Sequence, residues 1–151
     1  MKKLFVAAAV ASAVLVPIAA QAEKTSFNYG MRLEPPGLDP RTGAAAAISR
    51  ITLYNIYEGL TRIAADGSVK PALAKSWTVS PDGLVYTFNL EQGVKFHDGS
   101  DFDASDVKYT FEENAAENSK NKRKGRFTNI ASIETPDAKT VILTLKEPRG
   151  D

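Results

Sequence analysis

The sequence predicts an α+β fold in which most strands pair antiparallel, and three observations lead to this prediction. Ser76 to Val79 and Leu84 to Leu90 are rich in β-branched and aromatic residues and are joined by Pro81-Asp82-Gly83, which has the residue types of a tight turn. A second pair of such runs lies near the end of the sequence. A helix pattern with a polar cap lies between the two pairs. The chain has 151 residues, which is enough for a domain with its own core.

The N-terminal segment has the pattern of a secretory signal peptide. Two lysines precede an apolar run from Leu4 to Ala20, and Ala20-Gln21-Ala22 supplies the small residues of a cleavage site. A membrane-spanning helix is disfavoured because the run is short and contains Pro17 near its end. We therefore expect residues 1–22 to be removed after export. The chain has no cysteine, so we expect a periplasmic protein without a disulfide or an N-terminal lipid anchor.

Four elements are expected before the central hairpin. Alternating apolar residues predict a first strand from Thr25 to Leu33, which the following prolines end. A helix is expected from Gly43, with Gly59 as its C-terminal stop. Two short strands, Leu60 to Ala64 and Ser68 to Lys70, are expected to pair across an Asp-Gly turn of type I′.

Three strands in succession are expected at the centre of the chain. The run from Val94 to His97 follows the hairpin closely and predicts a third strand of an antiparallel meander. Within the strand Leu84 to Leu90, alternate side chains share a face, so one face is expected to lie in the core. The next helix is expected from Ala104 to Asn114, with Asp103 as N-cap and Asp106 in position to reach back to it.

The segment from Glu117 to Phe127 contains five cationic residues and no apolar periodicity, so it is expected to be an exposed loop. It is followed by the second hairpin, Ile130 to Glu134 with Thr140 to Lys146. Without the two lysines of the signal peptide, the basic and acidic residues nearly balance, and no nucleic-acid partner is expected. Contact of the basic loop with acidic ligands or with an anionic membrane face remains open.

The sequence lacks the residues of a recognisable catalytic or metal site. Its one histidine, His97, precedes Asp98, but adjacent strand residues point to opposite faces, so His97 is interpreted as capping a turn. The aspartates between Asp98 and Asp106 do not have the spacing of a calcium loop. We therefore expect no catalytic residue, no metal and no cofactor.

Several ordered blocks resemble the extracytoplasmic solute-binding proteins that supply ABC importers of oligopeptides, dipeptides and nickel. The resemblance extends over almost all of the chain after the signal peptide. Glu91 departs from the family, which usually has a basic residue there; this changes a surface contact. The blocks are Leu38-Asp39-Pro40, Tyr57-Glu58-Gly59-Leu60, Pro71-Ala72-Leu73-Ala74 with Ser76-Trp77, Asp82-Gly83 with Tyr86-Thr87-Phe88, Val94-Lys95-Phe96-His97-Asp98-Gly99, and Ala104-Ser105-Asp106-Val107.

The resemblance implies the N-terminal part of a two-lobed periplasmic binding protein, type II-like, with a mainly antiparallel accessory subdomain. Residues 23–59 would then begin the first lobe, residues 60–151 would form the accessory subdomain, and the chain would be an N-terminal fragment that stops before the second lobe. The implied function is the binding component of an ABC importer that delivers peptides or another small solute to the permease. We expect a monomer that is not an enzyme.

The resemblance also implies a ligand-binding segment, because in peptide-binding members the residues after Leu-Asp-Pro pair with the peptide backbone by strand addition. Some members place an acidic residue here to meet the peptide's amino group, and this sequence has none. Either residues beyond Asp151 meet that group or the ligand is not a free peptide. The expected ligand-binding residues are Thr42, Gly43, Ala44, Ala45 and Ala46.

Two other classes of protein remain open. One is a secreted hydrolase whose catalytic residues lie beyond Asp151, and the other is a small self-contained interaction domain.

Overall fold

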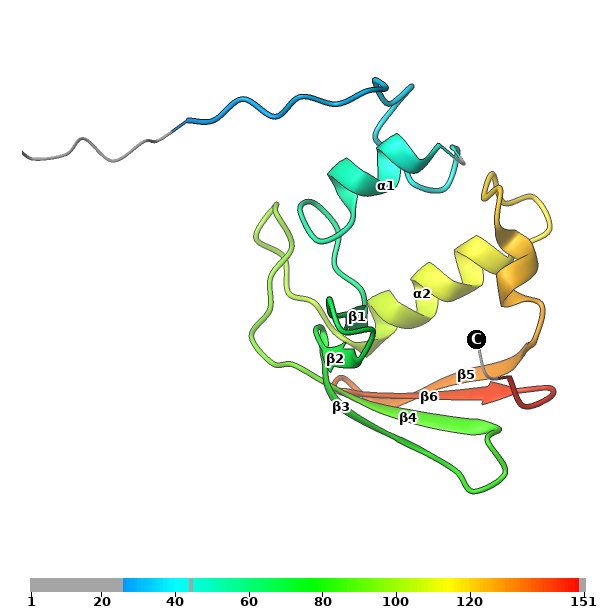
Figure 1. The fold of residues 1–151 in the computed structure, drawn as a ribbon. Coiled ribbons are helices and arrows are strands. Elements are labelled where there is room, and N and C mark those ends of the chain that lie inside the picture. The colour runs from blue at the N-terminus through cyan, green and yellow to red at the C-terminus, as the bar shows by residue number, and fades with distance from the viewer. Residues whose placement is uncertain (1–25, 44, 150–151) are drawn as a thin grey trace, which may run out of the picture. The chain divides into compact units, whose positions relative to one another are not determined.

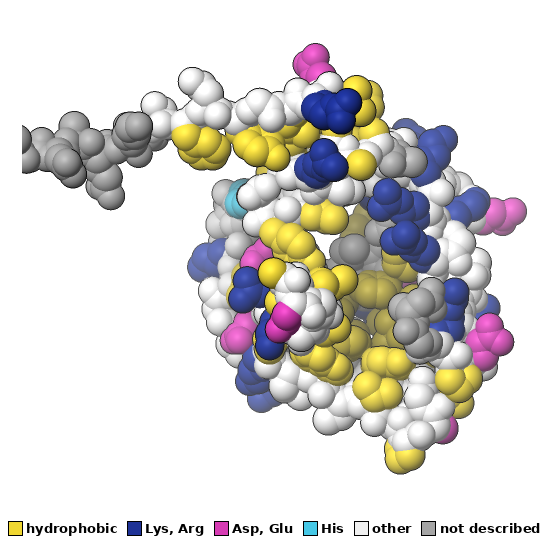
Figure 2. Space-filling model, in the orientation of Figure 1, with side chains coloured by type: hydrophobic (Ala, Val, Ile, Leu, Met, Phe, Trp, Pro, Cys, Tyr) yellow, Lys and Arg dark blue, Asp and Glu magenta, His cyan; other side chains and the backbone are white. Residues whose placement is uncertain are grey.

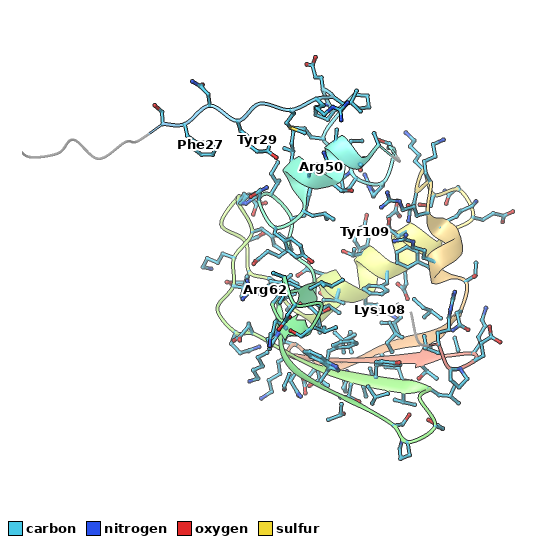
Figure 3. The ribbon with its side chains drawn as sticks, in the orientation of Figure 1. Phe27, Tyr29, Arg50, Arg62, Lys108 and Tyr109 are labelled. Atoms are coloured by element: carbon cyan, nitrogen blue, oxygen red, sulfur yellow. The ribbon has the colours of Figure 1, made fainter. Side chains whose placement is uncertain are left out.

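The structure is a computed structural model that describes residues 26–43 and 45–149. The chain divides into two compact units, residues 1–30 and residues 31–151. The predicted signal peptide lies outside the described residues. In the first unit, residues 26–30 have no regular secondary structure, and Phe27 and Tyr29, labelled in Figure 3, are both exposed.

The second unit begins with a short helix and a small sheet (Figure 1). Helix α1 spans Ala46–Thr52. Strands β1 (Thr61–Ile63) and β2 (Val69–Pro71) pair antiparallel, as predicted to within one residue. The turn between them is not of type I′, which needs a positive φ at both central residues. Only Gly67 has a positive φ in this turn, and the Asp66 carboxylate accepts a hydrogen bond from the amide of Ser68.

A four-stranded antiparallel sheet forms the centre of this unit, with the order β3-β4-β6-β5. Strands β3 (Ala74–Val79) and β4 (Val85–Leu90) form the predicted central hairpin. Strands β5 (Ile130–Asp137) and β6 (Thr140–Leu145) form the second one. The two hairpins join through β4 and β6, with Tyr86 opposite Leu143.

Helix α2 (Ala104–Ala115) lies across one face of this sheet (Figure 1) and closes the core. The predicted capping box is confirmed: the Asp103 carboxylate accepts from the amide of Ser105 at 2.7 Å, and Asp106 accepts from the amide of Asp103 at 2.8 Å. The core joins buried residues of the sheet and the helix, which are Ala74, Leu90, Ala104, Val107, Ile133 and Val141.

The predicted third strand of the meander is wrong. Residues 94–102 form a loop that closes on itself: the amide of Phe102 donates to Val94, and the amide of Phe96 donates to Ser100. The position beside β4 that a meander would give to this segment is taken by β6. Gly93, three residues after the end of β4, has a φ of 74°, and the chain leaves the sheet here.

Two predictions for the first part of the chain also differ from the structure. Residues 26–33 form no strand, and no described strand pairs with them. Helix α1 ends at Thr52, well before Gly59. The Thr52 hydroxyl donates to the carbonyl of Ile48 at 2.9 Å, and the amides of Ile56 and Tyr57 both donate to the carbonyl of Thr52. These bonds close a turn in place of further helix.

Candidate functional site

The predicted ligand-binding segment, residues 42–46, follows a turn that is held by one carboxylate. Asp39 accepts hydrogen bonds from the Arg41 amide at 2.9 Å and from the Arg41 guanidinium, with Nε at 3.1 Å and Nη2 at 3.1 Å. These bonds, the side-chain one foremost, hold the pKa of the Asp39 carboxyl below its usual value. The Thr42 hydroxyl also lies 3.4 Å from the carbonyl of Asp39. The turn therefore fixes the direction in which the segment begins.

Thr42 and Gly43 lie in the loop that leads to α1, and Thr42 is exposed. Ala45 is the N-cap, with extended dihedral angles (φ −65°, ψ 129°), and Ala46 is the first residue of the helix. Ala44 lies outside the described residues. Thr42, by contrast, lies in the turn, and the carbonyl of Ala45 already accepts a hydrogen bond from the amide of Ile48 at 3.1 Å.

Gly43 lies against a buried side chain. A Cβ atom added there would come closer than 3.0 Å to Cδ1 of Ile48, a distance that real Cβ atoms essentially never show. Ile48 is only 2% exposed, so its side chain has little space to move. The close approach disfavours a side chain at this position, although Gly43 has no positive φ.

A mostly apolar cavity of about 1260 Å³ lies between the first elements and α2. Figure 2 shows a hollow with hydrophobic side chains in its wall. The lining comes from residues 38–41, from residues 54–61, from the loop 94–97 and from α2. Tyr109 of α2 is exposed on the side of the helix that faces away from the sheet (Figure 3). On the other side of α2, Lys108 donates to the carbonyl of Ile133 in β5 at 2.7 Å. Of the predicted ligand-binding residues, the four that the structure describes, Thr42, Gly43, Ala45 and Ala46, do not line this cavity, although the preceding turn does.

The basic segment, residues 117–127, is exposed as predicted for most of its length, but it is more ordered than expected. It ends in a 3-10 helix, η1 (Lys124–Phe127), and the Phe127 ring packs edge-on against Phe111 of α2 at a centroid distance of 5.7 Å. Asn121 is buried, and its carbonyl oxygen Oδ1 accepts from the amide of Arg123 at 2.9 Å.

One hydrogen bond joins the basic segment to the turn before the ligand-binding segment. The amide of Lys122 donates to the carbonyl of Arg41 at 2.9 Å. A second, polar hollow of about 320 Å³ lies at this junction. Sequence reasoning missed this junction, because no local pattern links residues so far apart in the chain. Its lining residues are Arg41, Glu113, Asn118, Lys120 and Asn121.

The structure places His97 on the loop 94–102, exposed and bordering the apolar cavity. The prediction that it caps a turn is wrong: within the described ranges it makes no hydrogen bond, and Asp98 caps this turn by accepting from the amide of Ser100 at 2.9 Å. Hydrogen bonds from Ser100, first from its hydroxyl and then from its amide, hold the pKa of Asp98 below its usual value. In the described part of the chain, no three acidic, histidine or cysteine side chains converge on a possible metal position.

Among residues 26–43 and 45–149, no helix has both the length and the apolar character needed to cross a bilayer.

Residues 68–151 match the family described as bacterial extracellular solute-binding proteins, family 5 middle. The glutathione-binding protein GsiB of Salmonella paratyphi A is 43% identical over 111 residues, which are 74% of this chain and 22% of GsiB.

Two solved structures extend this similarity to the fold. NikZ from Campylobacter jejuni, in complex with Ni(L-His), matches with a TM-score of 0.68 and 36% identity over 77% of this chain and 23% of NikZ. The oligopeptide-binding protein AppA from Bacillus subtilis, in complex with a nonapeptide, matches with a TM-score of 0.70 and 29% identity over 75% of this chain and 22% of AppA. The chain spans less than a quarter of the length of these relatives. It belongs to the family-5 solute-binding proteins of ABC importers, and its α+β fold is that of part of a two-lobed periplasmic binding protein.

Proposed function

We propose that this chain belongs to the substrate-binding component of an ABC importer, that it binds peptides, and that it delivers them to the permease in the membrane. Family membership is the observation that carries the proposal. Its relatives include an oligopeptide-binding protein and a protein that binds glutathione, which is itself a small peptide. NikZ, by contrast, is in complex with Ni(L-His), so a metal chelate is the alternative ligand that the test must include.

In this proposal the peptide backbone meets the segment that contains Thr42 and Gly43. The segment suits strand addition because its side chains are small and its backbone lies beside a turn that is fixed by the Asp39–Arg41 hydrogen bonds. Recognition through backbone groups does not depend on the identity of the peptide's side chains. It therefore fits a transporter that accepts several sequences.

The proposed mechanism is closure of two lobes around the ligand. A ligand that binds the closed arrangement better than the open one shifts the population toward the closed form, which the permease then recognises. No covalent step is involved. The proposed location is the periplasm, after removal of residues 1–22, and the proposed state is a monomer.

We also propose that residues 23–59 begin the first lobe and that residues 60–151 form the accessory subdomain. The apolar cavity supports this division, because residues 38–41 and 54–59 contribute one side of it and α2 with the loop 94–97 contributes the other. The cavity would then mark the junction between the two parts.

The test uses the gene product at its natural length, purified after export. Its melting temperature is measured with glutathione, with peptides of two to nine residues, and with Ni(L-His). A ligand that binds the folded protein and not the unfolded chain raises the melting temperature, by an amount that grows with the ratio of the ligand concentration to Kd. We expect at least one class of peptide to raise it. If only the nickel complex does so, the protein is a metal-chelate carrier and the peptide assignment is wrong.

A further inference from the structure

The basic segment of residues 117–127 carries positive charges that form no salt bridge within the described residues. Among the described residues, the salt bridges join Arg41 to Asp39, Lys95 to Asp101 and Lys108 to Glu112, and none involves a cation of this segment. The Lys124 ammonium donates to the carbonyl of Glu117 at 3.0 Å, which leaves its charge without a carboxylate partner. No acidic residue occurs between Glu117 and Glu134. The exposed cations are Lys120, Lys122, Arg123, Lys124 and Arg126.

The segment is held in place beside the predicted ligand-binding residues. The hydrogen bond from the amide of Lys122 to the carbonyl of Arg41, at 2.9 Å, brings it to within one residue of Thr42 along the chain. The buried side chain of Asn121 and the packing of Phe127 on α2 anchor it on both sides of Lys122. Figure 2 shows Lys and Arg side chains gathered above the C-terminal end of α2.

The lining of the polar hollow at this junction carries no excess charge of its own. Arg41 is paired with Asp39, and the remaining charged residues of the lining, Lys120 and Glu113, have opposite signs. The excess of positive charge comes from the neighbouring cations of the basic segment. Lys122 and Arg123 follow directly and are exposed, which makes the potential around the hollow positive. An anionic group close to Thr42 would therefore be attracted.

We propose that this basic segment selects solutes with a net negative charge, because it places Lys120 and Lys122 beside the start of the ligand-binding segment. The inference rests on the proposed function. A membrane surface is the less suitable partner, because the segment presents no exposed aromatic or large aliphatic side chain that could enter a bilayer: Phe127 is packed on Phe111.

The experiment uses the gene product at its natural length and three probes of equal size, the tripeptides Ala-Glu-Ala, Ala-Gln-Ala and Ala-Lys-Ala. At pH 7 their net charges are about −1, 0 and +1. Binding is measured by titration calorimetry at low salt and again at about 0.15 M salt, where charges are screened beyond about 8 Å. We expect the anionic peptide to bind about fivefold more tightly than the neutral one at low salt, and the difference to shrink at higher salt.

The test variant combines Lys120→Glu with Lys122→Glu, and the control combines Lys70→Glu with Lys75→Glu. Both variants change the net charge equally at exposed positions, but Lys70 in β2 and Lys75 in β3 lie away from the junction. We expect the test variant to lose or reverse the charge preference and the control to keep it. Circular dichroism shows whether both variants are folded.

Four outcomes would overturn the inference. Equal binding of the three peptides would leave the proposed function standing and remove charge selection. A preference that survives in the test variant would place the selecting charges elsewhere. Unchanged binding with a loss of uptake in cells would make the segment a docking surface for the permease. If no tripeptide binds at about 1 mM while Ni(L-His) does, the proposed function fails first and the inference fails with it.

Discussion

Gly43→Ala should disturb the ligand-binding segment through one side chain. The new Cβ would approach Cδ1 of Ile48 to less than 3.0 Å, whereas an ordinary contact between carbon atoms lies near 3.5–4 Å. Ile48 is 2% exposed, so relief requires an unfavourable rotamer or a backbone shift. Overpacking of this kind costs about 1–3 kcal/mol, partly offset by about 0.4–1 kcal/mol because alanine restricts the unfolded chain.

Ile48→Val supplies the second arm of a double-mutant cycle. It removes Cδ1 and leaves Cγ1 at 3.7 Å from the new Cβ, which is an ordinary contact. Alone it should cost about 0.5–1.5 kcal/mol. The double variant should be no less stable than Ile48→Val alone, which gives a favourable interaction energy of about 1–2 kcal/mol.

The assay is native-state hydrogen exchange at the amide of Ile48, which donates to the carbonyl of Ala45 at 3.1 Å and reports opening of the first turn of α1. Gly37→Ala is the control, because nothing lies within 4 Å of a Cβ at Gly37 and its φ is not positive. The reasoning is refuted if the effects of Gly43→Ala and Ile48→Val simply add, or if Gly43→Ala behaves like Gly37→Ala.

Three further predictions concern the core, the acid limit and the isolated chain. Leu90→Ala should lower the free energy of urea unfolding by about 2–5 kcal/mol because Leu90 is 1% exposed in the core, whereas Val79→Ala, at an exposed position of β3, should cost far less; equal losses would contradict the assigned core. Hydrogen bonds from Ser105, first from its hydroxyl and then from its amide, lower the pKa of Asp103, so the contribution of Asp103 to the free energy of unfolding is complete above the unfolded pKa of about 4 and is lost as pH falls through the lower folded value. Asp103→Asn, which cannot titrate, should flatten the dependence of the free energy of unfolding on pH in this range, and an unchanged dependence would argue against the cap. The 151-residue chain alone should bind peptides weakly or not at all in calorimetry, since closure needs two lobes, and micromolar binding would contradict this.

The parts of the fold that could be predicted are those with local chemistry. In the turn that precedes β4, the Asp82 carboxylate accepts from the amide of Leu84 at 3.0 Å, and Gly83 has a φ of 72°. The cap of α2 is equally local, because Asp103 and Asp106 lie three residues apart. Short polar side chains and glycine determine these features without help from the rest of the chain.

The parts that could not be predicted depend on partners distant in sequence. Val94 to His97 has the composition of a strand, but Gly93 turns it away and β6 pairs with β4 in its place. The early end of α1 depends on hydrogen bonds that converge on Thr52. A hydrophobic pattern reports burial, and it does not report which strand is the neighbour.

The candidate site also has one part that the sequence predicts and one part that it does not. The ligand-binding segment is predicted from the resemblance carried by Leu38-Asp39-Pro40 and the blocks after it, and it stays a prediction. The junction with the basic segment could not be predicted, because a single backbone bond between Lys122 and Arg41 creates it. The charge of that segment was visible in the sequence, but its position was not.

The most direct test of the account is hydrogen exchange of the gene product at its natural length, with and without a saturating peptide identified by the melting-temperature screen. We predict that ligand slows exchange at the backbone amides of residues 42–46, because strand addition gives them a new acceptor or shields them from water. The account is contradicted if the peptide binds and these amides exchange at the same rate in both samples.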